Sequence, residues 1–121
     1  FESDLPPAPL AQFIDKFPRE VFGINYDSGN SAALGYGSAE EISAYAARIL
    51  NVHVKDRLLG GTTVSLGTGA ADLAKAIRLI EQSGYRGQYV LQTARATDSD
   101  HAGALARYRD MTVRWIEDAR R

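Results

Sequence analysis

A predicted strand followed by a predicted helix repeats four times along the 121 residues of this chain. The predicted strands are the opening segment 1–3, Val21–Asp27, the segment 51–57 and Tyr89–Ala94. Strict alternation of strand and helix implies a parallel sheet with right-handed crossovers. The sequence therefore predicts one α/β domain over residues 1–121, a length that suits a single modest core.

The four predicted helices carry apolar residues at helical spacing. The first runs over residues 10–17 and ends at Pro18, and the third runs from Leu73 to near Gly84. The second opens with Ser38–Glu41, a capping box in which the serine oxygen accepts from a free helical amide and the glutamate reaches back to another. Asp98 is predicted to cap the long last helix.

The segment 51–57 places a histidine, two cations and an acid on one short strand and its exit. Successive side chains of a strand point to opposite faces, so Val52 and Val54 face one way. Asn51, His53 and Lys55 face the other way. A face that aligns an imidazole with an ammonium needs polar surroundings, and the carboxyl-end mouth of an α/β barrel provides them.

Residues with metal-ligating side chains stand near the carboxyl ends of the four predicted strands. Each lies on the less apolar side of its strand, and together they are Glu2, Asp27, His53 and Gln92. Any one of them alone is most simply explained as a hydrogen-bonded polar residue. Two carboxylates, an imidazole and an amide oxygen in this spacing predict an octahedral site for Mn, Mg, Co or Zn.

The charge balance excludes several classes of partner. A net charge of -1 provides no field that would hold a polyanion, so we expect no nucleic-acid binding. No apolar run approaches the roughly 20 residues of a membrane-spanning helix, so we expect no membrane partner. The chain has no cysteine, which fits a reducing compartment, and the cytoplasm is the expected location.

Four short motifs follow one another in a recognisable order: 27–30 (DSGN), 53–56 (HVKD), 67–73 (GTGAADL) and 84–87 (GYRG). In order and spacing they resemble the sugar phosphate isomerase/epimerase family, whose fold is the xylose isomerase-like TIM barrel. The resemblance runs from Glu2 to the final helix and corresponds to the C-terminal half of that barrel.

The resemblance implies a divalent metal at the barrel mouth. Glu2, Asp27 and His53 match family ligands, and the carbonyl oxygen of Gln92 can also bind a metal. Asn30 matches a substrate-contacting position, while Lys55 and Arg57 would face substrate oxygens.

Catalysis in this family implies a pair of glutamates that move protons beside a carbonyl group. Glu2 matches the first of the pair. Gln92 stands where the second is expected, and its amide cannot transfer a proton. A single-base isomerase, or an acid supplied by a neighbouring loop, remains compatible with this departure.

The family barrel has eight strand–helix units in roughly 250 residues, and this chain holds four. The predicted fold is therefore a (βα)4 half of a TIM barrel. The chain begins at Phe1 without a methionine, so we expect either a fragment of a longer barrel or a natural half-barrel. Because such a half exposes two open sheet edges, we expect a homodimer that closes an eight-stranded barrel.

Three functions remain open at this point. The first is an isomerase or epimerase of a small sugar or sugar phosphate that is weak or inactive alone, and the second is a self-associating structural half-barrel without activity. The third, a DNA-repair endonuclease of the same superfamily, is disfavoured by the net charge of -1. The glycine-rich loops 60–63 and 67–69 are either phosphate cradles or ordinary loops.

Overall fold

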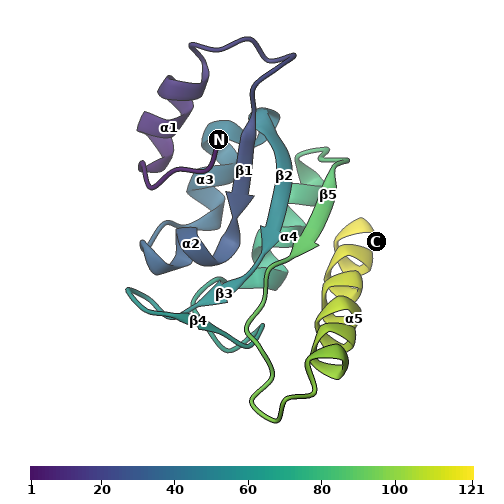
Figure 1. Ribbon diagram of the computed structural model, residues 1–121. Coiled ribbons are helices and arrows are strands. Elements are labelled where there is room, and N and C mark those ends of the chain that lie inside the picture. Colours follow the sequence, from purple (N-terminus) through teal and green to yellow (C-terminus); the bar gives the residue numbers. More distant parts are fainter.

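The computed structural model describes residues 1–121 and has a parallel sheet of three strands in the order β1-β2-β5. The strands are β1 (Ile24–Asp27), β2 (Ile49–Val54) and β5 (Gln88–Leu91). Both pairings are parallel, so the carboxyl ends of the strands meet at one edge of the sheet (Figure 1). The predicted parallel sheet is confirmed, although β1 and β5 are shorter than expected.

The opening segment lies beside β1 without forming a regular strand. The Phe1 amino group donates to the Gly23 carbonyl, and the Asn25 amide donates to the Phe1 carbonyl at 2.7 Å. These two bonds flank Ile24 in the pattern of a parallel ladder. The segment therefore occupies the place predicted for the first strand, and it pairs through one residue.

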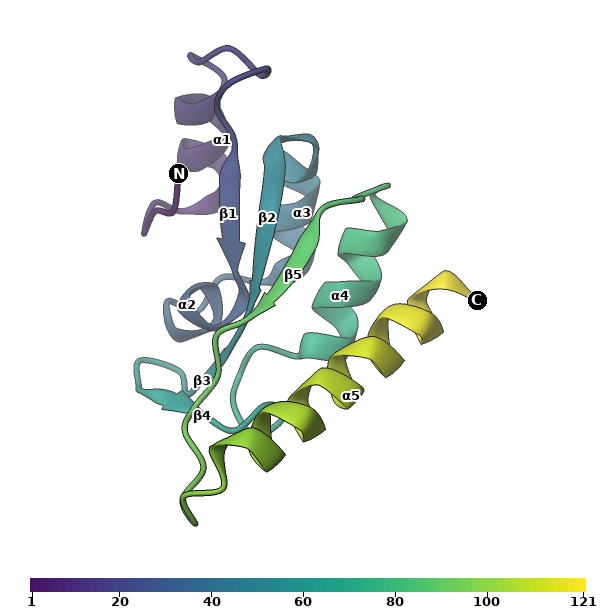
Figure 2. The same ribbon diagram turned by 45° about the vertical axis from the view of Figure 1, so that its right-hand side comes forward.

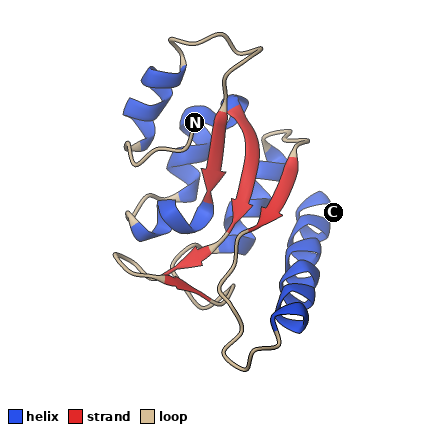
Figure 3. Cartoon of the chain, in the orientation of Figure 1, coloured by secondary structure: helices blue, strands red, loops and turns tan.

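Helices cover one face of the sheet. They are α1 (Pro7–Ile14), α3 (Ser38–Tyr45), α4 (Leu73–Gln82) and α5 (His101–Arg120). Figures 1 and 2 show α3 and α4 behind the sheet, with α1 beside α3 and α5 along α4. The other face carries no layer of helices, and the sheet does not close on itself (Figure 3). None of the helices has both the length and the apolar composition needed to cross a bilayer.

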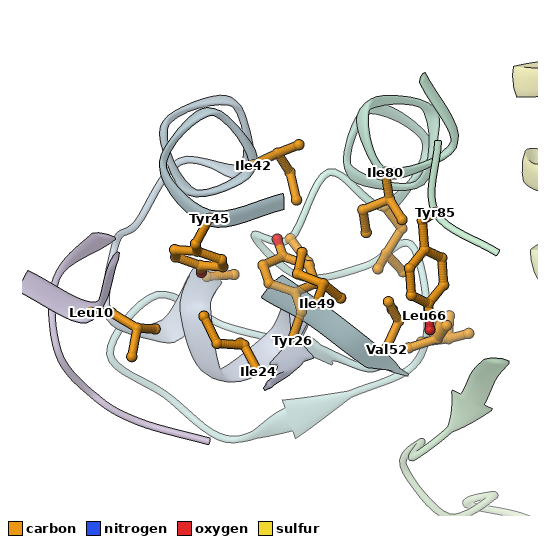
Figure 4. Packing of buried hydrophobic residues seen from close by; sticks show 14 of the residues in the cluster. Leu10, Ile24, Tyr26, Ile42, Tyr45, Ile49, Val52, Leu66, Ile80 and Tyr85 are labelled. Atoms are coloured by element: carbon orange, nitrogen blue, oxygen red, sulfur yellow. The ribbon is translucent and has the colours of Figure 1, made fainter. Parts of the chain in front are cut away.

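The hydrophobic core lies between the sheet and this helical layer. Val52 and Val54 of β2 are each only 1% exposed, and Val52 belongs to a cluster with Ile42 of α3 and Ile80 of α4 (Figure 4). Burying each such side chain contributes about 1.5–3 kcal/mol. The predicted alternation along β2 is confirmed, because His53 between the two valines faces the uncovered side and stays half-buried.

The predicted capping box at the start of α3 is wrong. Gly37 is the residue before the first turn, and Ser38 lies inside the helix without making a capping hydrogen bond. The Glu41 side chain is turned inward, where it accepts hydrogen bonds from Ser31 Oγ at 2.5 Å and Tyr45 OH at 3.0 Å. Because these contacts hold the carboxylate in the interior, it cannot reach back to the start of the helix.

Other boundaries also differ from the prediction. The second predicted helix ends in the short 3-10 turn Ala46–Arg48. The last helix is capped by Asp100, whose Oδ1 accepts from Gly103 N at 2.9 Å, and Asp98 instead accepts from the Asp100 amide. At the start of α5, the local hydrogen bond made by Asp100 takes the place of the predicted Asp98 cap.

Two small elements at the carboxyl edge of the sheet were not predicted. A six-residue helix, α2 (Ser28–Ala33), follows β1 directly. The predicted strand 51–57 is divided, and its exit forms β3 (Asp56–Arg57), which pairs antiparallel with β4 (Thr63–Val64). The strand–helix alternation is therefore interrupted beside the candidate site, where Figure 1 places the hairpin below the sheet.

Asp56 organises the loop that follows this hairpin. Its side chain is 1% exposed, and it accepts from the backbone amides of Gly67 and Gly69 at 2.9 Å each and of Ala71 at 3.1 Å. The amides of Gly67 and Gly69 are therefore occupied by a carboxylate of the chain itself. This loop is not an open phosphate cradle, because an internal anion already fills it.

We expect Asp56→Asn to destabilise the chain by about 3 kcal/mol, because buried amides lose charged acceptors and one faces a new N–H donor. Urea denaturation followed by circular dichroism measures the effect. Asp110→Asn on the exposed part of α5 is the matched control, with a change within about 0.5 kcal/mol. Equal effects of the two substitutions would contradict this account of the loop.

Burial raises the pKa of the Glu41 carboxyl above its ordinary value of 4.5, and hydrogen bonds from Ser31 and Tyr45 oppose the shift. A carboxyl with a raised pKa in the folded state binds its proton more tightly when the chain is folded. Its contribution to stability is complete below the unfolded-state pKa. That contribution is lost as the pH rises through the folded-state pKa.

We expect Glu41→Gln to remove this loss of stability. The unfolding free energy of the variant minus that of the wild type should increase as the pH rises above about 4.5, the ordinary pKa of a glutamate. Urea titrations at a series of pH values measure the difference. Glu117→Gln, on the exposed side of α5, is the matched control, and an equal pH dependence of the two variants would contradict the assignment.

Candidate metal centre

The ends of β1 and β2 bring an aspartate and a histidine side by side. Asp27 is the last residue of β1, and it is the register partner of His53 in β2. His53 Nδ1 lies 3.7 Å from Asp27 Oδ2 and 3.9 Å from Glu2 Oε2. One ligand-type atom from each of these three residues lies within 4.8 Å of the others, and we call them the ligand group.

The Asp27 carboxylate gives the clearest test of whether a cation fits here. Its side chain is 2% exposed, and its Oδ1 accepts from the Asn30 amide at 2.8 Å as the cap of α2. Its Oδ2 is buried and has no hydrogen-bond partner. An unpaired buried carboxylate oxygen raises the free energy of the folded chain, and a bound cation would remove that penalty. Two carboxylates with an imidazole suit the divalent metals Mn, Mg, Co and Zn.

A ladder of side-chain amides leads along the strand ends to His53. Asn51 Nδ2 donates to Asn25 Oδ1 at 2.8 Å, and Asn25 Nδ2 lies 2.7 Å from Glu2 Oε2 and 3.2 Å from His53 Nδ1. An amide nitrogen can only donate, so His53 Nδ1 is the acceptor. A metal ligand at Nδ1 requires the same unprotonated nitrogen, so a cation bound there would take the place of the Asn25 donor.

Two predicted substrate contacts join the same network. Asn30 Nδ2 donates to Glu2 Oε1 at 2.6 Å, and Arg57 donates from Nη1 to Asn30 Oδ1 at 3.0 Å. The Gly61 carbonyl accepts from Arg57 Nε at 3.0 Å and from Nη2 at 2.7 Å. The β3–β4 hairpin thus holds the guanidinium against Asn30, which in turn contacts Glu2 of the ligand group.

Gln92 reaches the site through a lysine. Its amide oxygen accepts from Lys55 Nζ at 3.2 Å, and the same ammonium lies 3.7 Å from Asp27 Oδ2. The backbone amide of Gln92 donates to the Val54 carbonyl at 3.1 Å, which extends the β2–β5 pairing by one residue. Gln92 is therefore adjacent to the ligand group, with its oxygen engaged by Lys55.

Asn25 contacts both Glu2 and His53, and it is not among the site residues that the sequence predicts. The signal that could have identified it is its spacing of two residues from Asp27, which places both side chains on one face of β1. Ser28 was missed as well. Its hydroxyl accepts from Lys55 N at 3.0 Å and lies 2.7 Å from Lys55 O, so it fixes the start of the hairpin.

Comparison with known proteins gives a consistent result. A family model described as the xylose isomerase-like TIM barrel matches residues 7–117. The L-ribulose-5-phosphate 3-epimerase UlaE of Escherichia coli O1:K1 is 33% identical over 102 residues, covering 84% of this chain and 34% of that protein. UlaE of strain K12 is 33% identical over 97 residues, covering 79% and 33%. The chain spans about a third of the length of these relatives.

Two solved structures share the fold. A xylose isomerase domain protein from Planctomyces limnophilus superposes with a TM-score of 0.77 at 23% identity, covering 98% of this chain and 46% of that one. A second, from Alicyclobacillus acidocaldarius, has a TM-score of 0.65 at 18% identity and covers 82% and 38%. With a matching family model over most of its length, this chain belongs to the xylose isomerase-like TIM barrel family, the group of sugar phosphate isomerases and epimerases.

Proposed function

We propose that this chain is the C-terminal half-barrel of a metal-dependent isomerase or epimerase of a small sugar or sugar phosphate. The observation that carries the proposal is the ligand group of Glu2, Asp27 and His53, with an unpaired buried oxygen on Asp27. The names of the UlaE relatives support a sugar phosphate as the substrate class.

The residues of the site have distinct roles in this proposal. Glu2, Asp27 and His53 would hold a divalent cation, which supplies electrophilic polarisation of a substrate oxygen when it is bound. Glu2 would also move a proton, because a carboxylate is an acid–base group, and the amides of Asn25 and Asn30 hold its two oxygens in place. Arg57 and Asn30 would orient substrate hydroxyl or phosphate oxygens.

Gln92 limits the chemistry of the isolated chain. Its amide cannot act as a second proton-transfer group, although its oxygen could serve as a fourth ligand. We propose that the chain by itself is weak or inactive as an epimerase. A self-associating half-barrel without activity is the alternative, and the glutamine favours it.

The uncovered face of the sheet supports association of two copies. Parallel sheets are found almost only with both faces covered, and one face here has no cover. Val90 of β5 pairs in register with His53 on this face and is 39% exposed. β5 is also an edge strand. A two-fold axis parallel to the strands would pair the opening segment of one copy with β5 of the other and keep all strands parallel.

The cytoplasm remains the compartment that we propose for the protein. The absence of cysteine from the sequence is the observation that supports it, because a reducing compartment makes no use of disulfides.

The metal site is tested by calorimetric titration with manganese. We expect the wild type to bind one Mn²⁺ per site and His53→Ala to bind at least about tenfold more weakly, because an imidazole ligand is lost. His101→Ala is the matched control, since His101 is exposed at the start of α5. Equal heats for all three proteins would place the binding elsewhere. If the wild type gave no heat, the metal site would be refuted, and the self-associating half-barrel without activity would be the remaining function.

An activity assay then separates the two functions. Ketopentose phosphates supplied with Mn²⁺ should be turned over feebly or not at all by the chain alone. Rapid epimerisation would refute the limit that we assign to Gln92 and would establish a single-base enzyme.

Closure of the barrel is tested by light scattering after gel filtration. We expect a dimer at micromolar concentration, and we expect Val90→Lys to shift it to monomer because a charge enters the covered face. Val113→Lys on α5, where the valine is 44% exposed, is the control and should remain dimeric. A wild-type monomer would end the proposal of self-association.

A further inference from the structure

Lys55 places a fixed positive charge against the ligand group. Its side chain is 16% exposed, and its ammonium lies 3.7 Å from Asp27 Oδ2, the same separation as between that oxygen and His53 Nδ1. Gln92 Oε1 accepts from the ammonium at 3.2 Å. The oxygen that most needs a cation thus already has one nearby, outside hydrogen-bonding distance.

The chain is built to hold Lys55 in this position. Ser28 Oγ is within hydrogen-bonding distance of both the amide and the carbonyl of Lys55. A Cβ atom at Gly29 would lie 2.7 Å from Lys55 Cγ and 3.1 Å from its carbonyl carbon, so the absent side chain leaves the space that the lysine stem fills. Three consecutive residues therefore position Lys55. Asp27 attracts its ammonium, Ser28 holds its backbone, and Gly29 leaves room for its stem.

We propose that the Lys55 ammonium is a built-in counter-ion of Asp27 that competes with the divalent metal. This inference rests on the proposed metal site. A metal bound by the ligand group would share Asp27 Oδ2 with the ammonium, and two positive charges a few ångströms apart in a partly buried site repel each other. Metal binding therefore requires the ammonium to move away from Asp27, and this displacement lowers the affinity for the metal.

Gln92 belongs to the same arrangement. Its neutral oxygen holds the ammonium through a hydrogen bond but contributes no charge that would neutralise it. The site therefore combines two carboxylates with one internal cation, so its attraction for a divalent metal is reduced.

Calorimetric titration with Mn²⁺ tests this inference on the wild type, Lys55→Met and Lys75→Met. Methionine keeps an unbranched stem over Gly29 and removes the charge. We expect Lys55→Met to bind Mn²⁺ about tenfold more tightly than the wild type, because the repulsion is gone. Lys75 is exposed on α4, so Lys75→Met should bind like the wild type.

The outcomes are distinguishable. Equal affinities of the wild type and Lys55→Met would overturn the competition and leave the proposed metal site intact. No binding by either protein would overturn both. If only Lys55→Met bound Mn²⁺, the ammonium would be shown to prevent metal binding in the wild type.

A second measurement uses the wild type and so does not depend on the folding of a variant. Acetic anhydride labels exposed lysines, and mass spectrometry reports the extent at Lys55 and Lys75. We expect Mn²⁺ to raise labelling of Lys55 several-fold, because its ammonium is displaced from Asp27, and to leave Lys75 unchanged. Unchanged or reduced labelling of Lys55 would overturn the inference.

Discussion

The buried carboxylate of Asp27 is the group on which the rest of this site depends. One of its oxygens caps α2 through the Asn30 amide, and the other faces His53 and Lys55 without a hydrogen bond. The cap fixes where β1 ends and where α2 begins, so Ser28 and Gly29 reach Lys55. Burial of an unpaired carboxylate oxygen is unfavourable, so a cation bound beside Asp27 Oδ2 would stabilise the folded chain. The Asp27 side chain therefore both caps α2 and places an unpaired negative charge in the site.

The sequence predicted the large elements and the convergence of Glu2, Asp27 and His53, because both follow from periodicity. Alternation along β2 assigns Val52 to the core and His53 to the open face, and parallel strands must end at one edge. The parts that could not be predicted depend on contacts between distant residues. Glu41 turns inward because Ser31, in a helix too short to show periodicity, donates to it. The spacing of Asn25 from Asp27 places it on the same face of β1, but its contacts with Glu2 and His53 depend on the opening segment and on β2.

The uncovered face of the sheet connects association with the chemistry of the site. His53 and Lys55 lie on that face with side chains 21% and 16% exposed, so water still reaches them. A second layer over this face would remove that water and lower the local dielectric, which strengthens both the attraction between Asp27 and a cation and the repulsion between two cations. Covering the face would therefore increase the difference in free energy between a site occupied by the metal and one occupied by the lysine ammonium. Under the proposed dimer, metal affinity and association are thermodynamically linked.

Gln92 and Lys55 are best understood as one unit. A glutamate at position 92, at the place of the Gln92 amide oxygen, would meet the Lys55 ammonium at about 3.2 Å and form an ion pair. The ammonium would then be neutralised by that glutamate, and Asp27 would be free to serve a metal. With glutamine at position 92, no charge on that side chain balances the ammonium, and Asp27 is the nearest carboxylate to it. The loss of a second proton-transfer group and the uncompensated charge of the ammonium beside Asp27 are therefore two consequences of the same neutral side chain.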